Sequence, residues 1–109
     1  MCIQEFERIY GRPLPADLAD LYKNPVPIRF ELRNEKFVVE VQYFLHPEDQ
    51  SIEDIEKHLY AFAMSSDGFK LLIDLSNEAF PILQNEFGDI DSIGVTLKDL
   101  SDASTTFYL

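Results

Sequence analysis

The segment 60–75 constrains the fold of this chain more than any other. Residues 60–64 and 69–75 are apolar and β-prone, and Ser65–Gly68 between them ends in Asp-Gly, a pair that tolerates left-handed backbone angles. In 69–75, apolar residues at odd positions alternate with Lys70, Leu72 and Asp74. Because successive side chains of a strand point to opposite faces, the segment predicts a β-hairpin with one face in the core.

Other segments also favour strands. Ile28, Phe30 and Leu32 alternate with charged residues, which predicts a half-buried strand. A turn is expected at Asn34-Glu35. The β-prone run of residues 36–45 then predicts a long second strand, whose shared face carries Phe37, Val39, Val41, Tyr43 and Leu45. Residues 80–83 and 105–109 are shorter strand candidates. The predicted core of the sheet is Phe30, Val39, Val41, Tyr43, Phe62, Leu71 and Ile73, with Leu18 and Leu21 packed over it.

Short helices are predicted around these strands. Apolar residues recur at helical spacing in 3–10, and Gly11 ends the pattern. A second helix is expected to start at Pro15 and to end near Asn24-Pro25. Ser51 with Asp54 three residues later is typical of a third helix start, with Ile52, Ile55 and Leu59 as its buried stripe. A fourth helix is expected near 96–103.

The chain has 109 residues, 46% of them hydrophobic, with nine Phe and five Tyr. This size predicts a single domain, 1–109, that can bury a core without disulfides. One cysteine, Cys2, cannot form an internal disulfide, and we find no secretory signal or membrane-length apolar run. We therefore expect a cytoplasmic protein.

Charge restricts the partners. The net charge is −11, and residues 46–109 hold thirteen acidic and three basic side chains, net −10. Nucleic acid and anionic membranes would be repelled, whereas the acidic half either keeps the chain soluble or steers a basic protein. The candidate binding residues are Glu86, Asp89 and Asp91 in a loop beside Gly88, with Glu48 and Asp49 as a second cluster. Phe87 and Ile90 between the first three are expected to pack in the core, with anchoring in an interface as the alternative.

Catalytic and cofactor motifs are not found. His46 and His58 lie near acids, but their spacing matches no established metal-binding pattern, and we expect surface histidines. Cys2 has no histidine at a recognisable nucleophile signature, and four glycines form neither a phosphate-cradling loop nor a dinucleotide fingerprint. We expect no metal, no cofactor and no enzymatic activity.

The order of these elements resembles the SUKH superfamily, which includes yeast cell-wall-assembly regulators and bacterial toxin-immunity proteins. The segment 10–18, YGRPLPADL, is similar to the family's opening G-x-x-L-P-x-D motif. The hairpin 61–75 and the segment 93–100, IGVTLKDL, are similar to its central and closing segments. The Asn-Gly-Gly turn and the tryptophan common in the family are missing, so the resemblance implies a divergent, compact member. It implies an α+β domain with a largely antiparallel sheet wrapped by helices, which acts by binding proteins.

Three functions follow as hypotheses. The first is an immunity protein that binds and neutralises a cognate polymorphic toxin with a basic surface, such as a nuclease. The second is a scaffold or regulatory domain that binds another intracellular protein. The third is an enzyme or small-molecule binder with a pocket beneath the hairpin 67–74.

Overall fold

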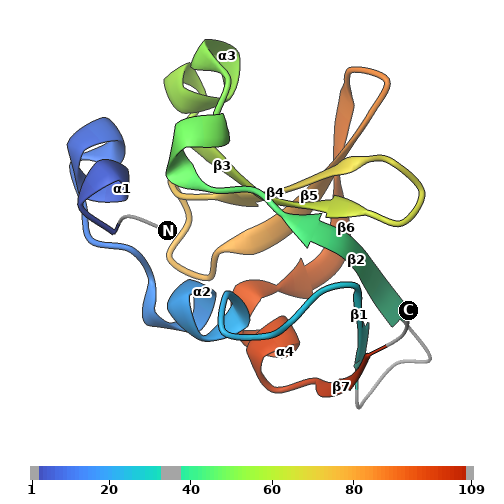
Figure 1. The fold of residues 1–109 in the computed structure, drawn as a ribbon. Helices are drawn as coiled ribbons and strands as arrows, with labels where there is room; N and C mark the ends of the chain where they lie inside the picture. The colour runs from blue at the N-terminus through green and yellow to red at the C-terminus, as the bar shows by residue number, and fades with distance from the viewer. Residues whose placement is uncertain (1–2, 33–37, 108–109) are drawn as a thin grey trace.

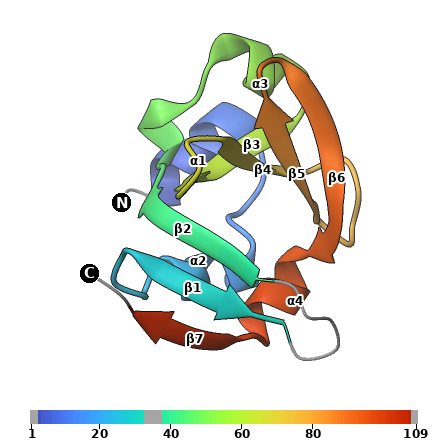
Figure 2. The same ribbon diagram turned by 90° about the vertical axis from the view of Figure 1, so that its right-hand side faces the viewer.

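A seven-stranded antiparallel sheet organises the molecule, in a computed structural model that describes residues 3–32 and 38–107. The strand order is β6-β5-β4-β3-β2-β1-β7. The sheet curls strongly, so that β1, β2 and β7 face back toward β5 and β6 (Figures 1 and 2). The strands are β1 (Ile28–Glu31), β2 (Val38–Phe44), β3 (Leu59–Ser65), β4 (Lys70–Asp74), β5 (Pro81–Glu86), β6 (Asp89–Thr96) and β7 (Ser104–Phe107).

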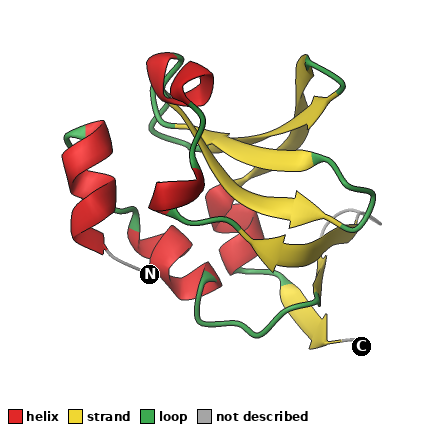
Figure 3. Cartoon of the chain, turned by 45° about the horizontal axis from the view of Figure 1, so that its top comes forward, coloured by secondary structure: helices red, strands yellow, loops and turns green. Residues whose placement is uncertain are grey.

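Short helices lie at the sides of the sheet, which makes the fold α+β (Figure 3). They are α1 (Ile3–Tyr10), α2 (Ala16–Leu21), the 3-10 turn η1 (Pro47–Asp49), α3 (Ile52–Glu56) and α4 (Leu97–Ser101). Gly11 follows α1 with a φ of 68°, the left-handed conformation expected after a helix. The Ser51 hydroxyl accepts a hydrogen bond from the Asp54 N–H at 3.1 Å, as the sequence predicts for the start of α3.

The main core fills the concave side of the sheet. It contains Phe6 of α1, Leu18 and Leu21 of α2, and Leu97 and Leu100 of α4. These helical side chains pack on buried residues of the strands, among them Phe30, Val39, Val41, Phe62, Leu71 and Ile73. The predicted core is thereby confirmed at every position except Tyr43. A smaller cluster of Leu59, Ala61 and Leu72 lies on the opposite face of the sheet.

Tyr43 is 48% exposed because the pairing of β2 with β3 shifts between Val41 and Tyr43. An irregularity of this kind changes the face to which the following side chains point, and Phe44 packs against the main core instead.

The prediction that Ile52 is a core residue of the third helix is also wrong, since Ile52 is 75% exposed at the start of α3. The buried residue of that helix is Asp54, 3% exposed, whose carboxylate accepts a hydrogen bond from the Lys70 ammonium at 2.5 Å. The predicted turn at Asn34-Glu35 and the side chain of Phe37 lie outside the described residues.

Candidate functional site: an acidic hairpin and its adjoining cavity

Glu86, Asp89 and Asp91 belong to a tight β-hairpin rather than to a loop. Glu86 ends β5, Asp89 begins β6, and the two pair directly across a two-residue turn, Phe87-Gly88. Both turn residues have positive φ, 53° and 94°, as the type I′ hairpin turn requires. The Asn85 side-chain oxygen accepts a hydrogen bond from the Gly88 N–H at 2.9 Å. The candidate residues are therefore held on a regular strand framework.

The register of β5 and β6 places all three acids on one face. Gln84 pairs with Asp91 and Glu86 pairs with Asp89, whereas Asn85 pairs with Ile90 between them. Residues directly opposite in an antiparallel pair point to the same side, and side chains alternate along each strand. The acidic face, defined here as Gln84, Glu86, Asp89 and Asp91, thus lies opposite Ile90, which packs with the smaller apolar cluster.

Phe87 projects from the tip of the hairpin. It is 92% exposed, so the expectation that it packs in the core is wrong. Its ring stands edge-on to that of Phe69, with 5.5 Å between the ring centroids. Phe69 precedes β4, and the contact joins the tips of two neighbouring hairpins. The result is an aromatic pair at the end of the acidic face.

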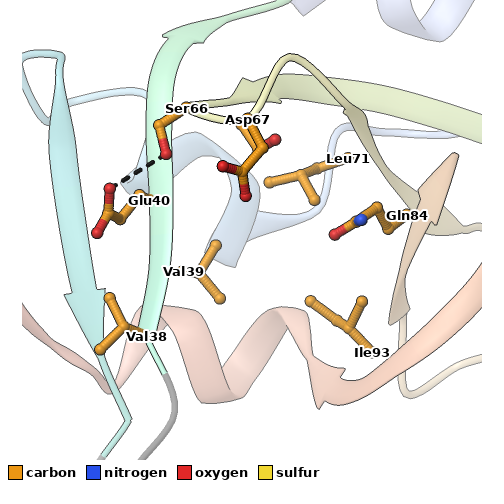
Figure 4. A pocket seen from close by; sticks show the side chains of 9 residues that line it. Val38, Val39, Glu40, Ser66, Asp67, Leu71, Gln84 and Ile93 are labelled. Carbon is orange, nitrogen blue, oxygen red and sulfur yellow. Dashed lines mark hydrogen bonds between the residues drawn. The ribbon is translucent and has the colours of Figure 1, made fainter. Parts of the chain in front are cut away.

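A cavity of about 210 Å³ adjoins this face (Figure 4). Val39, Leu71 and Ile93 supply its apolar walls, while the side chains of Asp67 and Gln84 supply polar groups. The cavity opens where β2 runs beyond the end of β3, because the pairing of these strands begins only at Val41 and Ser65. A hollow therefore lies close to the hairpin 67–74, where the sequence placed a pocket for its third hypothesis.

Lys70, the cation of the neighbouring strand β4, is directed away from the acidic face. Lys70 pairs with Asn85 in the sheet register, so its side chain leaves from the opposite face and its ammonium bonds to Asp54. Among the residues that the structure describes, no lysine or arginine lines the cavity. The described residues of the acidic face and of the cavity therefore carry acidic and neutral side chains.

The second predicted cluster, Glu48 and Asp49, lies elsewhere. Both residues belong to η1, which packs beside α1. The Asp49 carboxylate accepts a hydrogen bond from the His46 N–H at 2.8 Å and so caps this turn. The structure does not bring this cluster together with the acidic face.

The environment of η1 is built around tyrosines. The hydroxyls of Tyr22 and Tyr60 lie 2.6 Å apart, and the Tyr22 hydroxyl donates to the Leu45 carbonyl at 2.5 Å. Burial raises the pKa of both tyrosines, and the acids of η1 raise it further. The His46 ring lies 5.2 Å from that of Tyr22. Within the described residues, no group of three His, Cys, Asp or Glu side chains is arranged to hold a metal ion.

The cavity residues Gln84 and Ile93 are not recognised from the sequence, and for Phe87 the sequence offers exposure in an interface only as the alternative to core packing. One signal for the hairpin is present in Glu86-Phe87-Gly88-Asp89, since a glycine at the second turn position is typical of a two-residue hairpin.

Comparison of the chain with protein-family models, with curated proteins and with solved structures finds no significant match. No helix of the described ranges is both long and apolar enough to cross a membrane.

Proposed function

We propose that this chain is a protein-binding module whose acidic face and Phe87 contact a basic partner. One observation carries this proposal: the Phe87 ring stands exposed at the tip of the hairpin, on a left-handed backbone. It is 92% exposed and has a φ of 53°, a conformation that favours glycine or asparagine over a bulky side chain. A bulky residue in such a position is more easily explained by a contact with another molecule than by folding.

Charge around Phe87 defines the partner. Glu86 and Asp89 flank Phe87, and Asp91 and Gln84 extend the same face. Acidic groups around an exposed aromatic ring suit a protein surface rich in lysine and arginine, where they accelerate association. Within this class, the SUKH resemblance favours an immunity protein that neutralises a basic toxin, and nuclease toxins offer such a surface in their substrate clefts. The function requires binding alone and no chemistry by the chain itself.

The test first looks for a gene for a large toxin directly beside the gene of this chain, and then measures association of the purified chain with the toxin that such a gene encodes. The triple variant Glu86→Lys, Asp89→Lys, Asp91→Lys is compared with a control triple of exposed acids, Glu56→Lys, Glu78→Lys, Asp102→Lys, which changes the net charge equally. We expect the hairpin triple to bind at least about tenfold more slowly at low salt, with a smaller defect at high salt, because screening weakens exposed charges.

Equal association rates for the two triples would contradict the proposed surface. A growth assay with the toxin expressed in the same cells separates the two protein-binding functions. Protection by the native chain supports the immunity protein. Capture of a different protein without protection would instead assign the scaffold or regulatory role.

A further inference from the structure

We propose that the cavity beside the acidic face receives one arginine side chain of the partner. This inference rests on the proposed function, because it names the group on a basic partner that the site recognises. It concerns the hollow between β2, the β3–β4 turn and the β5–β6 hairpin, lined by Val39, Asp67, Leu71, Gln84 and Ile93 (Figure 4).

The size of the cavity favours a single side chain. Its volume of about 210 Å³ is below the range of roughly 300–1,000 Å³ that is typical of sites for whole small molecules. A protruding side chain of a partner needs less space, because the rest of the partner remains outside. The cavity is continuous with the acidic face, since Gln84 belongs to both.

The lining matches the two chemical parts of arginine. Val39, Leu71 and Ile93 offer an apolar wall for the aliphatic stem, which arginine commonly packs along apolar surface. Asp67 and Gln84 offer oxygen acceptors for the guanidinium, whose planar set of five N–H donors binds carboxylates with two hydrogen bonds. Among the described residues, none donates a hydrogen bond to the Asp67 carboxylate or forms an ion pair with it.

The wall that carries Asp67 is held in place before any partner arrives. The Ser66 N–H donates a hydrogen bond to the Glu40 carbonyl of β2 at 3.1 Å. The Ser66 hydroxyl donates a second one to the Glu40 carboxylate, also at 3.1 Å. Across the turn, the Gly68 N–H donates to the Ser65 carbonyl at 3.0 Å and the Phe69 N–H to the Ser65 hydroxyl at 3.1 Å. A turn fixed in this way lowers the entropy cost of binding at the cavity.

The experiment uses the full-length chain and N-acetyl-arginine amide as the probe, followed by NMR titration of the backbone amides. The matched probe N-acetyl-citrulline amide has nearly the same shape without the charge. We expect saturable shifts centred on Val39, Leu71 and Ile93, with the citrulline probe binding at least about tenfold more weakly, the usual effect of losing a charged hydrogen bond.

Variants test the role of each wall. Asp67→Asn should weaken the arginine probe about tenfold, whereas the control Asp102→Asn, an equal charge change on the exposed end of α4, should leave it unchanged. Gln84→Lys places a cation beside the cavity and should abolish binding while Asp67 remains. A folded Asp67→Asn variant with native affinity would overturn the inference, as would shifts spread evenly over all acidic surfaces or equal binding of both probes.

The outcome of the arginine titration and the outcome of the toxin-binding test can be told apart. Suppose that arginine binds in the cavity but the triple variant of the hairpin binds the toxin as fast as the native chain. This outcome would refute the acidic face as the partner surface and leave the cavity as an arginine site. Loss of toxin binding in the hairpin triple with no arginine binding would refute the cavity alone.

Discussion

Replacing Phe87 with asparagine separates folding from binding at the hairpin tip. The turn requires positive φ at Phe87 and Gly88, and asparagine adopts this conformation more readily than phenylalanine. We expect Phe87→Asn to leave the free energy of unfolding nearly unchanged or to increase it, while binding of the basic partner falls at least about tenfold, as for a hot-spot aromatic.

The magnitude follows from two opposing contributions. Relief of the left-handed backbone stabilises the variant by about 1 kcal/mol, the order of the penalty for a bulky residue in this region. Loss of the edge-on contact with Phe69 costs about 0.5–1.5 kcal/mol, and the lower end applies because the Phe87 ring is 92% exposed. The net change should therefore stay within about 1 kcal/mol of zero.

The assay is urea unfolding followed by far-ultraviolet circular dichroism, since the chain has no tryptophan for fluorescence. The control is Ile73→Ala at a fully buried position of β4, which should cost about 2–5 kcal/mol. A loss above about 2 kcal/mol for Phe87→Asn would refute the reasoning, because it would show that the ring contributes to the fold. A loss below about 0.5 kcal/mol for Ile73→Ala would refute the register of the sheet.

Three further predictions concern the rest of the molecule. Lys70→Met should lower the free energy of unfolding by about 1–3 kcal/mol, because it leaves the buried Asp54 carboxylate without its cation. The loss is smaller than for a fully buried ion pair, since Lys70 is 28% exposed. Adding Asp54→Asn should recover part of the loss in a double-mutant cycle. Burial raises the pKa of Tyr10, Tyr22 and Tyr60 in the folded chain, so their contribution to stability should be complete below pH 10 and be lost above it. The loss should reach at most about 1.4 kcal/mol per pH unit for each tyrosine, and Tyr60→Phe should reduce the slope by about a third in urea unfolding at several pH values. Treatment with a chelator should leave the thermal midpoint unchanged, and purified protein that carries stoichiometric zinc and melts several degrees lower without it would contradict this prediction.

Elements with a strong local pattern were predictable from the sequence. The helix 3–10 has apolar residues at helical spacing and a glycine at its end, and the structure contains it with the same bounds. The hairpin around Asp67-Gly68 follows from strand alternation and a turn pair whose backbone preference is local. The uneven charge is also a property of composition, so the acidic character of the candidate surface required no fold.

The strand β6 and the faces of several side chains depended on long-range pairing. In 89–96 the apolar residues Ile90, Ile93 and Val95 do not alternate regularly, and the strand forms because β5 offers it hydrogen-bonding partners. Tyr43 likewise matches the alternation of its strand, but the irregularity after Val41 arises from pairing with β3 and turns the ring outward.

The candidate site combines both kinds of information. The sequence by itself determined that acids cluster at 86–91, because composition and order are sufficient for that statement. Only the tertiary structure decided that Glu86, Asp89 and Asp91 share one face, since a shift of one residue in the register would send paired side chains to opposite sides. The cavity beside them required the tertiary structure as well, because its walls come from strands whose residues Val39 and Ile93 are far apart along the chain. Contacts of that kind are set by how the sheet curls and pairs, and local residue preferences do not encode them.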